Sequence, residues 1–183
     1  MIFAATGNEC QGNAISFPAC LDEVISVAST TGDHRRSKFV PDLRVGKRLC
    51  AIGEAIEAAW IDKTGSGLSS HSTTTRKAGT SYATPIVAGV AAMTMDLVWS
   101  VKEEHEYLCQ VLRTNRGMLS VLEEMIWRNE EQNIQCLLPW KFFNTPKWKI
   151  LGGKESTAGM AAYIRFTLFD TLNHVYINGP SKS

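Results

Sequence analysis

The seven residues Gly79 to Pro85, with the sequence Gly-Thr-Ser-Tyr-Ala-Thr-Pro, are the segment of the chain best suited to covalent chemistry. Gly79 permits a tight turn, and Ser81 stands at the start of a long apolar stretch that predicts a helix. The positive end of a helix dipole favours negative charge on an oxygen beside the serine. Pro85 fits the first turn of such a helix. The segment therefore predicts a nucleophilic serine.

A second candidate group is Asn8, which follows the short apolar run of residues 2–5. A side-chain amide at a strand end can donate a hydrogen bond to an oxyanion, together with the backbone N–H beside the serine. Considered alone, Asn8 is best interpreted as an Asx-turn residue at a strand end, and Ser81 as a helix N-cap, a common use of serine. The occurrence of both segments in one chain favours the catalytic interpretation. Gly79 and Thr80 would then contact the substrate.

Strands and helices alternate around these segments. Residues 2–5, 24–29 and 48–52 are apolar or β-branched runs bounded by polar and turn residues, and we expect three buried strands. Residues 63–78 are rich in Ser, Thr and Gly and predict a loop. Residues 82–99, 102–113, 115–129 and 157–172 predict helices, and 136–151 an irregular apolar segment. Strands and helices in this order predict an α/β layer fold.

Composition excludes several classes of partner and cofactor. The net charge of +1 over 183 residues gives no electrostatic reason to expect nucleic acid or an anionic membrane. The apolar stretch Ala83–Val101 has the length of a membrane span, but Pro85, Gly89 and Asp96 interrupt it, and we interpret it as a buried helix. The five scattered cysteines predict reduced thiols in an intracellular, cytoplasmic protein without a zinc site. We expect no metal and no cofactor.

Three strings together resemble the subtilisin-like serine proteases, the subtilase or S8 peptidase family. GTSYATPIVAGVAAM resembles the family's serine motif, AATGNE its oxyanion strand and loop, and PACLDEVISVAST the strand between them. The resemblance implies that Ser81 is the nucleophile and Asn8 the oxyanion donor of a serine endopeptidase. It also implies part of a subtilisin-like three-layer α/β fold with a mostly parallel sheet, followed by C-terminal helices.

The resemblance sets the expected division of the chain. Residues 1–101 match the C-terminal part of the peptidase domain, with an altered substrate-facing loop around residues 37–54. Residues 102–151 are expected to form a helical extension that packs on it. Residues 152–183 are expected to form a last helix and a loose tail.

The expected triad is incomplete within this sequence. In subtilisins the catalytic Asp and His precede the serine in the chain, and the seven residues before Asn8 include neither. The resemblance thus implies that a further N-terminal segment supplies Asp and His, and that peptides or proteins are the substrates. Of the histidines present, His71 is the candidate for a substitute base.

Two other functional classes stay open from the sequence. One is a non-catalytic module derived from a protease fold, inactive in isolation because its triad is incomplete. The other is an α/β-hydrolase esterase, whose G-x-S-x-G turn differs from this sequence at Ala83. The esterase hypothesis uses His105 or His174 as base but leaves Asn8 unexplained.

Overall fold

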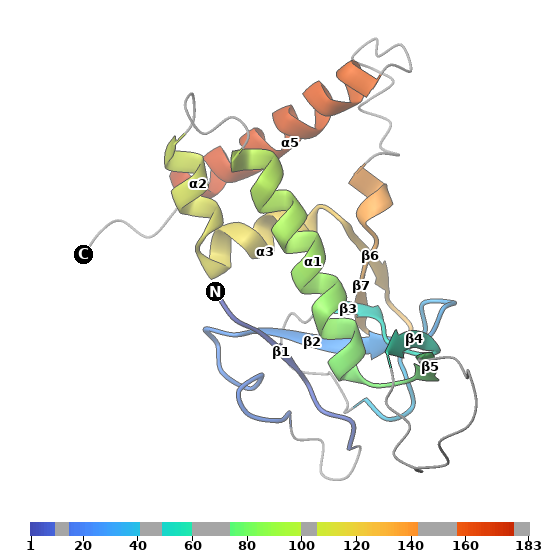
Figure 1. Ribbon diagram of the computed structural model, residues 1–183. Coiled ribbons are helices and arrows are strands. Elements are labelled where there is room, and N and C mark those ends of the chain that lie inside the picture. Colours follow the sequence, from blue (N-terminus) through green and yellow to red (C-terminus); the bar gives the residue numbers. More distant parts are fainter. Residues whose placement is uncertain (10–14, 41–48, 60–73, 100–105, 143–156, 178–183) are drawn as a thin grey trace.

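A five-stranded sheet forms the centre of the computed structural model, which describes residues 1–9, 15–40, 49–59, 74–99, 106–142 and 157–177 (Figure 1). The strand order is β1 (Phe3–Ala5), β2 (Ile25–Thr30), β3 (Leu49–Ile52), β7 (Ile134–Leu137) and β6 (Ile126–Asn129). The first four of these are parallel, and β6 runs antiparallel to β7. The expectation of an α/β fold with a mostly parallel sheet is confirmed.

The three strands expected at the N-terminal side are present within one or two residues of their expected bounds. All six residues of β2 are buried, because it lies between β1 and β3 and is covered on both faces. Interior parallel strands are commonly apolar throughout, since helices or loops pack on each side. This burial explains why residues 24–29 gave so clear a strand signal.

The long helix α1 (Thr80–Trp99) packs on β1, β2 and β3 through a stripe of buried residues. The stripe contains Ala83, Val87, Ala91 and Val98, at the i, i+4, i+8, i+15 spacing that places side chains on one helix face. In the described part of the chain, α1 is the one helix long and apolar enough to cross a membrane, a test that buried core helices also pass.

The remaining helices complete the main core on the same face of the sheet. They are α2 (Glu106–Leu112), α3 (Asn115–Glu123) and α5 (Thr157–Ile177). α2 and α3 pack on each other and on α5, and one continuous cluster joins them to α1 and the strands. Thr114 caps α3, since its Oγ1 accepts a hydrogen bond from Gly117 N–H at 3.0 Å.

The helix expected over 115–129 is half right. α3 ends at Glu123, and Ile126–Asn129 forms strand β6 instead. The reason is pairing: Leu138 N–H donates to Met125 C=O at 2.9 Å, and Ile126 opposes Leu137 in the β6–β7 ladder. Part of the region expected to be a helical extension therefore belongs to the main sheet, through β7 beside β3.

A small hairpin leads into the start of α1. It consists of β4 (Ile56–Ala59) and β5 (Thr74–Lys77), which pair in antiparallel register. β5 lies inside the segment expected to be a polar loop. Its four residues, Thr-Thr-Arg-Lys, lack an apolar alternation, so pairing with β4 rather than its own pattern makes it a strand.

Candidate active site

Asn8 is placed by the turn at the end of β1. Gly7 has a φ of +101°, a left-handed conformation that glycine adopts readily. A Cβ at Gly7 would also collide with the hydroxyl of Ser16, so this position admits no side chain. The turn brings Asn8 out of the strand onto the surface, at the end of the sheet where α1 begins.

Ser81 lies in the first turn of α1 and is exposed, as expected for a nucleophile. Its N–H is one of the first four of the helix, which have no partner within the helix. Tyr82 N–H donates to Gly79 C=O at 3.0 Å and tightens this turn. One expectation is wrong here: Pro85 lies inside the helix, not in its first turn, because α1 begins at Thr80. The proline leaves Ser81 C=O without the N–H that an i+4 residue normally supplies.

Asn8 and Thr80 are joined by two hydrogen bonds. Asn8 Oδ1 accepts from Thr80 N–H at 2.8 Å and from Thr80 Oγ1 at 3.0 Å. A backbone N–H requires an acceptor, so the amide oxygen must face Thr80 and the amide nitrogen must face away. Thr80 is buried, and its side chain therefore contacts Asn8 rather than open surface.

Gly79 separates the candidate oxyanion donor from the candidate nucleophile. A Cβ placed on Gly79 would lie 3.2 Å from Asn8 Nδ2 and 3.2 Å from Ser81 Oγ. Both groups therefore face the same point in space, which is open only because residue 79 has no side chain. An oxygen that develops negative charge beside Ser81 would meet the Asn8 amide, the Ser81 N–H and the positive end of α1.

Gly53 is a residue of this site that the sequence did not single out. Its C=O accepts from Gly79 N–H at 2.8 Å, and its own N–H donates to Thr30 C=O at 3.0 Å. A Cβ on Gly53 would lie 2.8 Å from Gly79 C=O. The turn that carries Ser81 is thus held to the end of β3. A glycine directly after a short buried strand was the available signal.

The described histidines do not complete a triad. His34 packs beside two indoles, with ring centroids 5.9 Å from Trp127 and 6.3 Å from Trp140. His174 is exposed on α5. His71 and His105 lie outside the described residues. Within the described part of the chain, no three His, Cys, Asp or Glu side chains are grouped to hold a metal ion.

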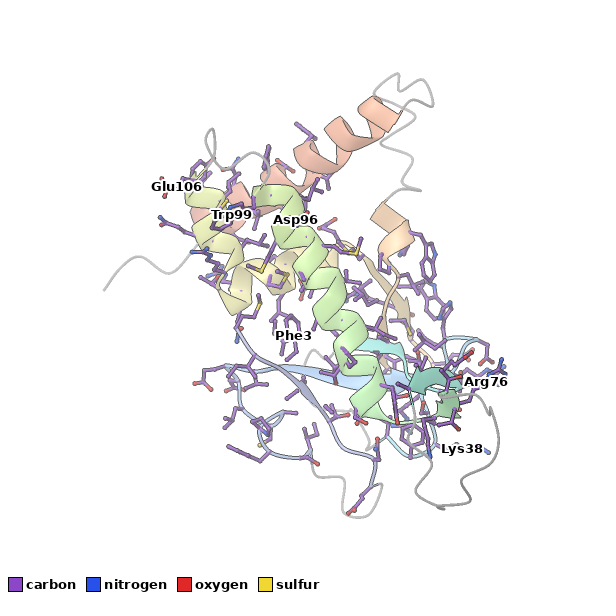
Figure 2. All side chains as sticks on the ribbon, in the orientation of Figure 1. Phe3, Lys38, Arg76, Asp96, Trp99 and Glu106 are labelled. Atoms are coloured by element: carbon purple, nitrogen blue, oxygen red, sulfur yellow. The ribbon has the colours of Figure 1, made fainter. Side chains whose placement is uncertain are left out.

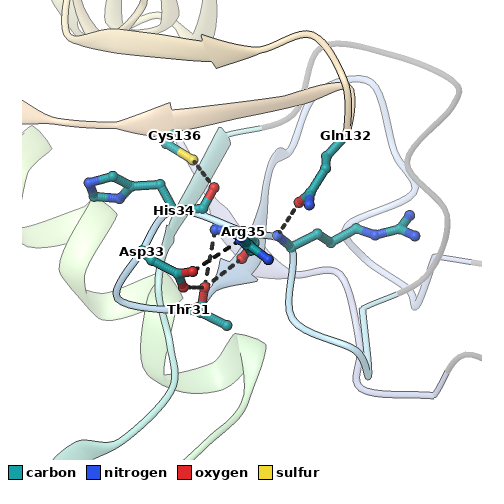
Figure 3. Close-up of polar contacts among 7 residues, drawn as sticks. Thr31, Asp33, His34, Arg35, Gln132 and Cys136 are labelled. Atoms are coloured by element: carbon teal, nitrogen blue, oxygen red, sulfur yellow. Dashed lines mark hydrogen bonds and ion pairs between the residues drawn. The ribbon is translucent and has the colours of Figure 1, made fainter.

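His34 belongs to segment 31–40 (residues 31–40), whose polar contacts reach Cys136 and Gln132 (Figure 3). A hydrogen bond from the Thr31 hydroxyl lowers the pKa of Asp33 below its ordinary value, and Asp33 pairs with Arg35 at 3.0 Å. His34 C=O faces the Cys136 thiol at 3.8 Å. Burial raises the pKa of that thiol to about 11. These polar contacts order the segment.

Comparison with known families and structures gives one family match. A model described as the subtilase family of peptidases matches residues 1–125. No curated protein matches the chain.

Solved structures provide the comparison of folds. The prenylagaramide maturation protease PagA is 22% identical at a TM-score of 0.54, and the match covers 90% of this chain and 50% of PagA. The self-cleaved protease domain of PatA is 23% identical at a TM-score of 0.47, covering 89% of this chain and 49% of PatA. The PatG macrocyclase is 17% identical at 0.48, covering 87% and 42%. The chain therefore spans about half the length of these structures.

Proposed function

Since the chain belongs to the subtilase family, we propose that it supplies the nucleophile and the oxyanion-binding half of a serine endopeptidase site. Ser81 is the nucleophile, and Asn8 Nδ2 and the Ser81 N–H are the oxyanion donors. The observation that carries this proposal is the placement of Asn8 Nδ2 and Ser81 Oγ at 3.2 Å from one unfilled point beside Gly79. Peptides or proteins are the substrate class, as for the maturation protease PagA.

The chemistry follows from these positions. Ser81 Oγ forms a bond to the scissile carbonyl carbon while a general base takes the hydroxyl proton. The carbonyl oxygen becomes an oxyanion, which the two donors stabilise. Collapse of this intermediate expels the amine, which takes the proton, and leaves an acyl ester on Ser81 that water hydrolyses. Gly79 gives the carbonyl room to approach, and Thr80 holds the Asn8 amide in the donating orientation.

We assign the general base and its carboxylate partner to a further segment that carries His and Asp. No described histidine contacts Ser81, and the matched structures are about twice as long as this chain. Among the described residues β1 is an edge strand of the sheet, and its outer edge is the place where such a segment would join. Thr6 N–H donates to Val27 C=O, and Ile25 N–H donates to Ile2 C=O. Residues 2, 4 and 6 thus face β2, and the backbone groups of Phe3 and Ala5 face outward.

The other edge of the sheet is protected. Leu138 N–H donates to Met125 C=O, so Ile126 points its backbone groups away from β7. Lys141 Nζ donates to that outward Ile126 C=O at 2.8 Å. Lys141 lies in the 3-10 helix η1 (Pro139–Phe142) and covers this edge carbonyl. A covered edge group discourages pairing with another strand. A complementary strand would therefore add at β1 and not at β6.

The outward face of α1 adjoins the β1 side of the molecule, because α1 packs on β1 through residues such as Phe3 (Figure 2). This face is mostly apolar: Pro85, Gly89 and Ala92 are exposed on it, Met93 is 75% exposed, and Asp96 is its exposed charged residue. A segment that pairs with β1 and also covers this face would bury both. The proposed partner is therefore a polypeptide with an apolar strand and an apolar helix.

A non-catalytic interaction module is the second candidate function for the chain alone. The same open edge and apolar face favour it, since they suit protein binding whether or not Ser81 reacts. The esterase hypothesis is set aside, because family membership accounts for Asn8 and the esterase motif does not.

Labelling with a fluorophosphonate distinguishes the two functions. The purified chain and its Ser81→Ala variant would be treated side by side, with circular dichroism to establish that both are folded. Labelling of the chain that is absent from the variant would support an activated Ser81. A folded chain that remains unlabelled alone and becomes labelled at Ser81 when that further segment is added would support the endopeptidase proposal with a base on the other segment. Unlabelled protein after addition of that segment would contradict the endopeptidase proposal.

A further inference from the structure

Two buried serines lie behind the turn that carries Ser81. Ser29, near the end of β2, and Ser37, in segment 31–40, are both completely buried. Their hydroxyl oxygens are 2.8 Å apart and hydrogen-bonded, and Ser37 N–H donates to Ser29 C=O at 3.1 Å. A buried pair of hydroxyls needs this mutual bond, because an unpaired buried hydroxyl is costly. The bond therefore fixes the direction of the Ser29 side chain.

The Ser29 hydroxyl lies beside Gly53, where a Cβ of residue 53 would otherwise stand. A Cβ on Gly53 would collide with Ser29 Oγ and lie 2.8 Å from Gly79 C=O. Ser29 Oγ and Gly79 C=O thus flank the same glycine from two sides. Gly53 C=O in turn accepts from Gly79 N–H at 2.8 Å. A continuous series of contacts runs from Ser37 through Ser29 and Gly53 to Gly79.

The geometry points to Ser29 and Ser37 as a positioning pair for the nucleophile turn, an inference that rests on the proposed function of Ser81 for its catalytic meaning. Neither serine touches the reacting atoms. The pair acts by keeping Gly53 and Gly79 at a fixed separation, and Gly79 carries the open point between Asn8 Nδ2 and Ser81 Oγ.

Without its bond to Ser37, the Ser29 hydroxyl would compete with Tyr82 N–H for the Gly79 carbonyl. When Ser37 no longer offers an acceptor, Gly79 C=O is the carbonyl that lies across Gly53 from Ser29 Oγ. That carbonyl already accepts from Tyr82 N–H at 3.0 Å in the first turn of α1. A hydroxyl that turned toward it would weaken the turn around Ser81.

Segment 31–40 also links the pair to the β6–β7 turn, at the other edge of the sheet from β1 (Figure 3). Arg36 N–H, one residue before Ser37, donates to Gln132 Oε1 at 2.8 Å, in the turn between β6 and β7. Arg36 forms an isolated bridge with Thr30, beside Ser29. The position of Ser37 is therefore set by two strands that are distant from Ser81 in the sequence.

Amide hydrogen exchange measured by NMR on the full chain tests this inference without relying on catalysis. In Ser37→Ala we expect the Gly79 and Tyr82 amides to exchange at least about tenfold faster than in the wild type, while the Val27 amide changes less. The matched control is Ser26→Ala. Ser26 is a buried serine on the same strand, two residues before Ala28 and on the opposite face from Ser29. This control should not accelerate Gly79 selectively.

If Ser37→Ala unfolds, amide exchange in the double variant Ser29→Ala/Ser37→Ala still tests the inference. Removal of both hydroxyls leaves no unpaired group, so protection at Gly79 and Tyr82 should return toward the wild-type value. Unchanged Gly79 exchange in Ser37→Ala, or a double variant no better protected than the single one, would overturn the inference. Failure of Ser81 to react with a fluorophosphonate when the base-supplying segment is present would count against the proposed function and leave the exchange result standing.

Discussion

The Asn8 side chain and the Thr80 backbone fix one another across 72 residues of sequence, with Asn8 Oδ1 2.8 Å from Thr80 N and 3.0 Å from Thr80 Oγ1. One amide thereby performs two tasks. Its oxygen caps the first turn of α1, and its nitrogen is left to face the point between Gly79 and Ser81. The structural and the proposed catalytic roles of Asn8 can therefore be separated by substitution.

Asn8→Asp should preserve the first task and abolish the second. A carboxylate still accepts from Thr80 N–H and Oγ1, whereas it cannot donate to an oxyanion and repels negative charge there. We expect a melting temperature close to the wild type. With the segment that supplies the base present, we expect a large fall in the rate of fluorophosphonate labelling at Ser81. In subtilisin itself, loss of the corresponding donor lowers kcat by about 10²–10³-fold.

Asn8→Ala is the matched variant, because it removes both groups. It should show the same loss of labelling together with a loss of stability of about 1–3 kcal/mol, since Thr80 N–H and Oγ1 lose their acceptor. Denaturant unfolding measures the stability. If Asn8→Asp were as unstable as Asn8→Ala, the amide oxygen would not be the group that holds Thr80.

Gly79→Ala tests the open point itself. The added methyl group would lie 3.2 Å from both Asn8 Nδ2 and Ser81 Oγ, where a tetrahedral intermediate needs room. With the segment that supplies the base present, we expect labelling at Ser81 to fall by more than tenfold, while circular dichroism stays unchanged. Gly89→Ala, in the helix that follows Gly79, is the control, since nothing lies within 4 Å of the added Cβ. It should leave labelling intact and raise stability by about 0.5–1 kcal/mol. Equal labelling of Gly79→Ala and wild type would contradict the assignment of the open point beside Gly79 as the oxyanion site.

The sequence predicted these site residues because they lie in local patterns. Asn8 follows the end of one apolar run, and Gly79 and Ser81 precede the start of another; turn chemistry marks both boundaries. Gly53 and the Ser29–Ser37 pair could not be predicted in the same way. Their roles depend on contacts between β2, β3 and segment 31–40 that no spacing in the chain specifies.

The fold was predictable to a similar extent. Strand β2 is buried throughout and is apolar or β-branched along its length. Helix α1 is buried along one stripe, and its apolar sequence predicts a helix. The helix predicted over residues 115–129 was wrong at 126–129. Met125 and Ile126 are apolar at helical spacing, yet this segment pairs with Leu137 and Leu138. Tertiary pairing overrides local propensity in such short segments.

The open surface on α1 and β1 predicts association of the isolated chain. Met93 is 75% exposed on an apolar helix face beside a free strand edge. We expect binding of the dye ANS and concentration-dependent oligomers in size-exclusion chromatography with light scattering. Met93→Lys should reduce both, because a charge on that face disfavours burial. Phe166→Ser, at a 62% exposed apolar residue on α5, is the control and should change neither by much. A strictly monomeric wild type without dye binding would contradict the proposed docking face.

Alkaline pH should destabilise the chain through Cys136. Burial raises the pKa of this thiol from 9.0 to about 11, so the folded state keeps a proton that the unfolded state loses over this interval. Stability from this group is therefore complete below pH 9 and falls as the pH rises from 9 to 11. Thermal unfolding at pH 7, 9 and 10.5 should show the loss, and Cys136→Ala should make the curve flatter between pH 9 and 10.5. Cys20→Ala is the control, since Cys20 is exposed and its removal should leave the alkaline loss in place. An equally steep loss in Cys136→Ala would show that another group governs the alkaline transition.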